Sequence, residues 1–120
     1  KYNLIKQVSF IDENTESFKV YKLSKIHVMP TITTPNSIEG FGISNVEAAS
    51  FGLPCIVSDS GGIAESVSVN GKIIKENNVD ELTIAIIDTL KNIKKLSKKS
   101  QQFAKKFQNK KKIKEYLNSF

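Results

Sequence analysis

Apolar and polar stretches alternate along the chain in a pattern that predicts short strands separated by helices. Short apolar runs at 26–29, 55–58 and 72–74 each lie beside a glycine or a proline, as strand ends commonly do. Apolar residues recur at helical spacing over 43–51 and again over 82–93. Strands that alternate with helices in this way are typical of α/β proteins with a parallel sheet, which is the predicted fold class.

Weaker signals predict further elements. A short helix is expected over about 15–24, and Asn78 is expected to cap the helix after the last strand, with Glu81 as its capping-box partner. The Asn70-Gly71 pair predicts a tight turn, because both residues tolerate positive φ. Beyond Ser97, apolar residues at helical spacing predict two amphipathic helices with lysine-rich outer faces.

Ligands of parallel sheets bind at the carboxyl ends of the strands, in the loops that lead into helices. Here those loops span 30–42 and 59–63, and both carry glycine. The first loop ends with the segment 39–42, Glu-Gly-Phe-Gly, and the following helix carries Glu47, eight residues beyond Glu39. Glycine turns and an acid pair therefore both predict a ligand site at one edge of the sheet.

These residue types suit a phosphorylated, polyhydroxylated ligand. Gly40 and Gly42 allow the backbone to approach a ligand closely. The helix that starts near Ile43 offers free N–H groups and a partial positive charge to a phosphate. A carboxylate accepts hydrogen bonds from two neighbouring hydroxyls, so Glu39 and Glu47 each suit a sugar diol. The segment therefore predicts a nucleotide-sugar site; the alternative is a pair of ordinary surface acids near a helix N-terminus.

The same segment belongs to a longer pattern. That pattern comprises the strand at 26–30, Glu-Gly-Phe-Gly at 39–42, Glu-Ala-Ala at 47–49, Gly-Leu-Pro-Cys-Ile-Val-Ser at 52–58, Gly-Gly-Ile-Ala-Glu at 61–65 and Asn-Gly at 70–71. It resembles the E-x7-E region of retaining GT-B glycosyltransferases of the family-4 type, also called glycosyl transferases group 1.

The resemblance implies a hexosyl- or related glycosyltransferase. Such an enzyme transfers sugar from a nucleotide-diphosphate sugar, with retention, to a glycan, lipid or other acceptor, and needs no metal or other cofactor. By position, Glu39 would be the catalytic residue in contact with the donor sugar, and Glu47 would bind the ribose hydroxyls. The donor-binding loop would comprise Gly40, Phe41, Gly42 and Ile43. Gly61 and Gly62 are a candidate phosphate or acceptor loop, with a plain tight turn as the alternative.

The resemblance also implies how the chain is organised. Residues 1–120 would form the later part of a Rossmann-like GT-B C-terminal domain, with a lysine-rich helical tail over about 91–120. The family's basic phosphate-binding pair and its acceptor domain are expected to lie outside this piece. We therefore expect the 120 residues alone neither to catalyse transfer nor to fold robustly.

The family's strand order refines this expectation. A strand near 8–10 would be the family's third, separated from 26–29 by two strands that this chain lacks. The remaining strands are expected to lie side by side and parallel, in the order 26–29, 55–58 and 72–74. Glu39 and Gly61 should then lie at the same end of the sheet, and 26–29 should form an apolar edge.

Charge is distributed unevenly along the chain. All 18 basic residues are lysine; eleven lie between 91 and 114, where no acid occurs, and the rest of the chain has 7 lysines against 12 acids. Without arginine the chain lacks the usual bidentate readers of bases, so no nucleic-acid partner is expected. The lysine-rich segment is interpreted either as a solvated helix face or as a peripheral contact with anionic membrane.

The single cysteine and the single histidine argue against a disulfide, a nucleophilic thiol and a histidine-based metal site. Cys55 has no partner for an internal disulfide, which fits a reducing cytoplasm, and its apolar surroundings predict a buried thiol rather than a nucleophile. His27 lies in an apolar strand and offers no histidine-based metal site. We expect a cytoplasmic protein, either free or peripheral on the cytoplasmic face of the membrane, with no metal site.

Two other functions remain open from the sequence. The chain could belong to another GT-B enzyme, such as a nucleotide-sugar epimerase, which a product assay would distinguish. It could also be a non-catalytic Rossmann-like module that binds nucleotide or membrane. Binding to liposomes without any affinity for nucleotides would favour that module.

Overall fold

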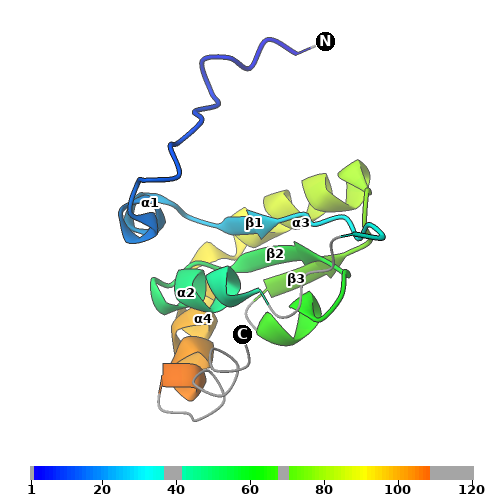
Figure 1. Ribbon diagram of the computed structural model, residues 1–120. Helices are drawn as coiled ribbons and strands as arrows, with labels where there is room; N and C mark the ends of the chain where they lie inside the picture. Colours follow the sequence, from blue (N-terminus) through cyan, green and yellow to red (C-terminus); the bar gives the residue numbers. More distant parts are fainter. Residues whose placement is uncertain (1, 37–41, 68–70, 109–120) are drawn as a thin grey trace.

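A three-stranded parallel sheet, in the order β1-β2-β3, forms the centre of the computed structural model (Figure 1). The structure describes residues 2–36, 42–67 and 71–108, with residues 107 and 108 described by their backbone alone. The elements in chain order are α1 (Ser17–Leu23), β1 (His27–Met29), α2 (Ile43–Ser50), β2 (Cys55–Ser58), the 3-10 helix η1 (Ile63–Ser66), β3 (Gly71–Ile74), α3 (Val79–Lys91) and α4 (Ile93–Gln108). The predicted α/β class, the parallel pairing and the order of the three strands are confirmed.

The central strand β2 is buried along its whole length, which fits the apolar character of its first three residues. Its Ile56 lies opposite Val28 of β1 and Lys72 of β3. The two outer strands are less buried, and β1 forms one edge of the sheet, as predicted. All three strands end at the same side of the sheet, which we call the carboxyl edge.

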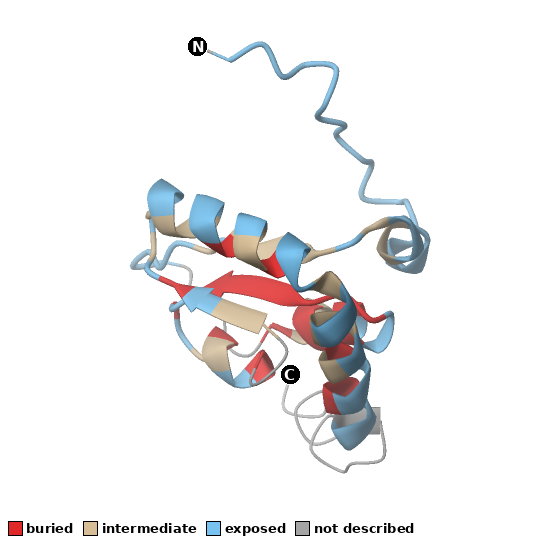
Figure 2. Ribbon diagram, turned by 180° about the vertical axis from the view of Figure 1, so that it is seen from behind, coloured by how far each residue is buried: buried red, intermediate tan, exposed pale blue. Residues whose placement is uncertain are grey.

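Helices cover both faces of the sheet (Figures 1 and 2). Because side chains alternate along a strand, neighbouring residues of β2 contribute to different clusters. One cluster lies on the face covered by α2 and η1 and comprises Ala48, Leu53, Cys55, Val57, Ile63 and Val67. The other lies under α3 and comprises Ile56, Ile74 and Ala85.

Gly71 is required for a different reason from the one its sequence predicts. Its φ is not in the left-handed region, and it begins β3 rather than forming the second position of a turn. A Cβ atom there would lie 2.0 Å from the carbonyl oxygen of Cys55 and 2.3 Å from Val67 Cγ1. Close packing between β3, β2 and the residue after η1 therefore selects glycine, while Asn70 lies outside the described residues.

The predicted cap of α3 is present, but its capping box is not reciprocal. Asn78 Oδ1 accepts a hydrogen bond from the backbone N–H of Glu81 at 2.9 Å. The Glu81 carboxylate accepts from the backbone N–H of Lys75 at 2.7 Å instead of returning to Asn78. The acid thus ties β3 to α3.

The long helix α4 begins earlier than predicted, because α3 ends at Lys91 and only Asn92 separates the two helices. Its inner face packs on α2 through a buried cluster that comprises Val46, Ala49, Phe103 and Ala104. The predicted second helix of the tail lies outside the described residues.

The expected strand near 8–10 is absent from the structure. The segment before α1 runs away from the sheet (Figure 1), and Phe10 is 98% exposed. A short strand is stable only beside a neighbour, and no described strand pairs with this segment. The same lack of cover leaves Phe18 exposed.

Candidate functional site

Of the predicted site residues that the structure describes, those that begin α2 and those that follow β2 lie at the carboxyl edge. Gly42 and Ile43 begin α2, Glu47 lies just over one turn into that helix, and Gly61 and Gly62 follow β2. The remaining predicted residues, Glu39, Gly40 and Phe41, lie outside the described residues, so their predicted roles stay predictions.

Gly42 adopts the left-handed conformation, with φ 78° and ψ 63°, as the N-cap of α2. A Cβ atom on this residue would lie 2.6 Å from Asn45 Nδ2 and 3.3 Å from Ser66 Oγ. Both the backbone conformation and the packing therefore require glycine here. The first N–H groups of a helix have no intrahelical acceptor, so the fixed start of α2 presents donors at the carboxyl edge.

A buried polar cluster connects the start of α2 to η1. Asn45 is fully buried, and its Nδ2 donates to Ser66 Oγ at 2.9 Å; Ser66 in turn donates to the carbonyl of Ile63 at 2.6 Å. Within the described residues, Asn45 Oδ1 and His27 Nε2 have no hydrogen-bond partner. Burial lowers the pKa of His27, and the neighbouring Asn45 side chain opposes that shift. We call His27, Asn45 and Ser66 the buried cluster.

Glu47 is exposed on α2 and has a partner that the sequence did not predict. Tyr21 of α1 donates its hydroxyl to Glu47 Oε2 at 3.4 Å. Burial and then the Glu47 charge raise the pKa of Tyr21 to about 12, so the phenol stays protonated and remains a donor. The only sequence signal for Tyr21 was its place in the helical spacing of α1.

The Tyr21 ring is itself fixed by two neighbouring rings. It meets His27 edge-on at 5.9 Å between centroids, and Phe51 in a tilted contact at 5.6 Å. These contacts come from β1 and from the end of α2. They hold the Tyr21 ring beside Glu47.

A polar cluster joins the loops that follow all three strands. Thr33, after β1, donates its backbone N–H to Glu76 Oε1 at 3.1 Å, and its hydroxyl also contacts Glu76. The Thr33 hydroxyl further hydrogen-bonds Ser60, which follows β2. These hydroxyl contacts lower the pKa of Glu76. We call Thr33, Ser60 and Glu76 the loop cluster.

The loop cluster explains how the second glycine loop is positioned. Ser60 is buried and directly precedes Gly61, which has a φ of 54° and is exposed. Ser58 Oγ donates to the carbonyl of Thr31, a second tie between the same two loops. The prediction that the first two loops meet at one edge is confirmed for their described parts. A ligand role for Gly61 and Gly62 stays a prediction.

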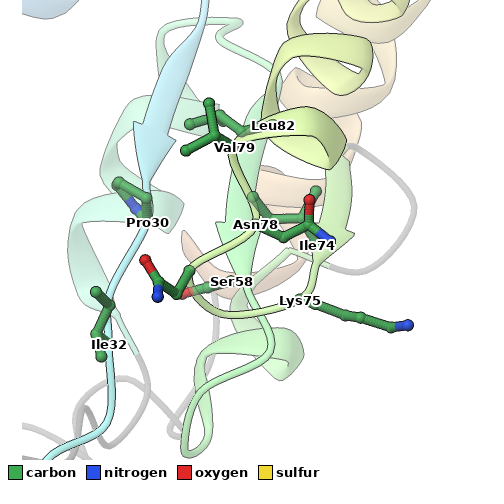
Figure 3. A pocket seen from close by; sticks show the side chains of 9 residues that line it. Pro30, Ile32, Ser58, Ile74, Lys75, Asn78, Val79 and Leu82 are labelled. Atoms are coloured by element: carbon green, nitrogen blue, oxygen red, sulfur yellow. The ribbon is translucent and has the colours of Figure 1, made fainter.

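A small hollow opens at the same edge on the α3 side of the sheet (Figure 3). Pro30 and Ile32 line it from the end of β1, while Val79 and Leu82 line it from the start of α3. Its volume is about 140 Å³. Small-molecule sites usually measure roughly 300 to 1,000 Å³, so this hollow alone does not accommodate a nucleotide sugar.

The described residues show neither a reactive thiol nor a metal site. Cys55 is fully buried, as predicted, and burial raises its pKa to about 12, so it is not a thiolate at neutral pH. Among the described residues, no group of three or more histidine, cysteine, aspartate or glutamate side chains is placed to hold a metal ion. Likewise, no helix in the described part of the chain is both long and apolar enough to cross a bilayer.

Comparison with known proteins shows which proteins the chain resembles. The chain is 39% identical over 75 residues to the poly(glycerol-phosphate) alpha-glucosyltransferase of Bacillus subtilis (strain 168), a match that covers 60% of this chain and 11% of the relative. It is 27% identical over 94 residues to the probable sucrose-phosphate synthase 5 of Oryza sativa subsp. japonica, covering 75% of this chain and 9% of the relative. The chain thus spans about a tenth of the length of these curated relatives.

The family match covers more of the chain than the match with either relative does. The model of the family described as "Glycosyl transferases group 1" matches residues 1–110. That span contains the sheet, both glycine loops and α4. The chain therefore belongs to the glycosyl transferases group 1 family.

Proposed function

We propose that this chain is the later part of the donor-binding domain of a retaining glycosyltransferase that uses a nucleotide-diphosphate sugar. The observation that carries the proposal is the geometry at the start of α2. There the left-handed Gly42 fixes free helix N–H groups, and Glu47, oriented by Tyr21, stands one turn further on. Amide donors beside a carboxylate suit a diphosphate joined to a ribose diol.

Each site residue has a role in this proposal. The backbone of Gly40, Phe41, Gly42 and Ile43 holds the sugar and the phosphates. Glu47 binds the ribose hydroxyls, and Glu39 contacts the donor sugar as the catalytic residue. Gly61 and Gly62, which the loop cluster holds at the same edge, contact the phosphates or the acceptor.

The proposed chemistry is a displacement on one face of the sugar. The bond between the anomeric carbon and the phosphate oxygen breaks, and the acceptor hydroxyl oxygen bonds to that carbon on the same face. The acceptor proton passes to the leaving phosphate. The amides at the start of α2 stabilise the negative charge that develops on this phosphate.

Sugar, acceptor and compartment complete the proposal. One relative is named for α-glucosyl transfer, which supports a hexosyl donor. The acceptor is a glycan, a lipid or another hydroxyl compound. A single buried thiol supports a reducing cytoplasm. The proposal involves no metal, so transfer should persist in a chelator; complete loss that a divalent ion restores would contradict this part.

Residue-resolved nucleotide binding tests the proposal. In ¹⁵N-labelled chain titrated with UDP, GDP and ADP, one nucleotide should shift the amide signals of Gly42, Ile43, Glu47 and Gly61. Glu47→Gln should weaken that binding, whereas Asp80→Asn, an equal loss of charge on the exposed side of α3, should not. Shifts confined to other residues would reject the site. A product assay that showed epimerisation instead of transfer would reject the reaction.

A further inference from the structure

The outer side of α4 and the last residue of α3 form a positively charged surface. It comprises Lys91, Lys94, Lys95, Lys98, Lys99, Lys105 and Lys106, which we call the lysine surface. All but Lys99 are exposed. Within the described residues, none of the seven forms an ion pair; the described ion pairs are Lys19–Glu16 and Lys72–Asp88.

This surface is fixed to the body of the protein. Ser100, Phe103 and Ala104 on the inner side of α4 are buried. Ser97 Oγ donates to the carbonyl of Gly52 at 2.7 Å, which ties α4 to the end of α2. The exposed lysines therefore belong to a helix whose other side is buried (Figure 2).

Like charges on this helix repel one another. On α4, Lys94 and Lys98 stand four residues apart, as do Lys95 and Lys99. Such like-charge pairs destabilise a helix by roughly 0.2 to 0.5 kcal/mol each. No acid occurs between 91 and 114 to relieve the repulsion. A partner with a high density of negative charge would relieve it, so the surface is complementary to a polyanion.

Exposed apolar side chains of α3 lie near the lysine surface. Ile84 is 67% exposed, Ile87 is 49% exposed and Leu90 is 44% exposed. Ile87 and Lys91 are four residues apart and so share one face of the helix. At the corner between α3 and α4, a shallow open hollow is lined by Lys91, Asn92, Ile93, Lys94 and Lys95. The lysine surface is thus continuous with exposed isoleucine and leucine.

We propose that the lysine surface and the exposed apolar side chains of α3 dock the protein on an anionic lipid bilayer. Lysines would lie among the headgroups, and Ile84 and Ile87 would enter the interface, the division of roles seen in interfacial amphipathic helices. A nucleic-acid partner is disfavoured, because the chain has no arginine to read bases and the described phenylalanine of α4, Phe103, faces inward.

Docking in this way leaves the candidate site open. α3 starts after the carboxyl end of β3 and runs back across the sheet, so Lys91 and α4 lie at the opposite end of the strands (Figure 1). The start of α2 and the loop cluster therefore face away from the bilayer. The proposal does not depend on the proposed function, and its test needs no nucleotide.

Co-sedimentation of the full chain with vesicles tests the proposal. Binding is expected to phosphatidylcholine vesicles that contain about one third phosphatidylglycerol and not to pure phosphatidylcholine, with a steep loss as salt rises. Replacing Lys91, Lys94, Lys95 and Lys98 by Gln should lower the partition coefficient roughly a thousandfold, since each basic residue near an anionic surface contributes about 1 kcal/mol. Ile84→Ser with Ile87→Ser should lower it about threefold or more.

Matched controls keep these results specific. Replacing Lys6, Lys19, Lys22 and Lys25 by Gln removes the same charge elsewhere and should leave most binding intact. Circular dichroism shows whether each variant folds, and the salt dependence of the unmodified chain tests the charge term without any variant. Equal binding to neutral vesicles, or equal losses in both lysine variants, would overturn the proposal. Tighter binding to an oligonucleotide than to the anionic vesicles would assign the surface to nucleic acid instead.

Discussion

The carboxyl edge and the lysine surface are both polar, but they are built on opposite principles. At the carboxyl edge and along α2, polar side chains have specific partners: Asn45 bonds Ser66, Tyr21 bonds Glu47, and Thr33 bonds Glu76. On the lysine surface no described lysine has an ionic partner, and all the charges are positive. The first region is defined by its geometry, and the second by its charge.

This difference predicts how each region responds to change. Geometry is lost when one residue is replaced, so single substitutions at the edge should have large and specific effects that salt changes little. Charge is additive and screened, so single substitutions on the lysine surface should have small effects that disappear at high salt. Five changes test this contrast, from the largest expected effect to the smallest.

Glu39→Gln should have the largest effect. In an active transferase that contains this domain, it should lower kcat by two or more orders of magnitude, about 3 kcal/mol, as for other preorganised polar contacts. Donor affinity should stay nearly unchanged, because the contact matters at the reacting centre. Steady-state kinetics at saturating donor measure this. A near-normal kcat would remove Glu39 from the reacting centre.

Gly42→Ala should destabilise the fold by about 2 kcal/mol, from left-handed strain and from the contact with Asn45. It should also displace the amides at the start of α2 and weaken nucleotide binding. Gly61→Ala is the matched control, because Gly61 has positive φ but is exposed. Thermal unfolding of both variants separates strain from packing. Equal losses in the two variants would mean that the contact beneath Gly42 contributes nothing.

Glu47→Ala should weaken binding of the donor nucleotide by about tenfold, in the range of a hydrogen bond to a charged group. It should leave kcat almost unchanged, because ribose hydroxyls do not change in the transition state. Tyr21→Phe keeps the carboxylate and removes only its donor, so it should cause a smaller loss. Calorimetric titration gives both affinities. A fall in kcat alone would contradict the ribose assignment.

The buried cluster should make stability depend on pH. Because burial lowers the pKa of His27, the unfolded chain binds a proton at higher pH than the folded chain does. The stabilisation is therefore complete above the unfolded pKa of about 6.5 and is lost as pH falls through the lower folded value. The melting temperature should fall from about pH 7 to about pH 5, and His27→Gln should flatten this slope. An unchanged slope would show that His27 is not the titrating group.

Lys94→Gln with Lys98→Gln should have the smallest effect and the opposite sign. Removing one like-charge pair should stabilise α4 by a few tenths of a kcal/mol at low salt and by almost nothing at high salt. Nucleotide-induced shifts at Gly42 and Glu47 should not change. Thermal unfolding at two salt concentrations tests this. A loss of nucleotide binding would mean that the two regions are not separate.

The sequence predicted the elements whose signals are local. The apolar runs of β1, β2 and β3 and the Asn78 cap were located correctly, because strand patterning and capping are properties of a few adjacent residues. The strand near 8–10 was wrong, because a strand exists only with a neighbour. Apolar patterning alone does not show whether that neighbour is present.

The candidate site was predictable only in part, for the same reason. Glycines and acids at the carboxyl edge are visible in the sequence, but their supporting contacts join distant segments. Tyr21 and Glu47 are separated by 26 residues, and Thr33 and Glu76 by 43. Gly71 shows the same limit, since the Cys55 carbonyl that excludes a side chain there belongs to another strand. Such pairings follow from the packing of the sheet and not from any local pattern.

The helix α2 connects the carboxyl edge to α4, whose outer side carries the lysine surface, and this makes it a route for thermodynamic linkage. Its first residue meets the carboxyl edge, while Val46 and Ala49 pack against α4. Any partner that binds only folded α4 raises the free energy needed to open that helix. Opening α4 would uncover the back of α2, so the amides of α2 should exchange with deuterium more slowly when α4 is occupied. A partner bound to α4 would thus change the hydrogen-exchange protection of α2 without changing the shape of the protein.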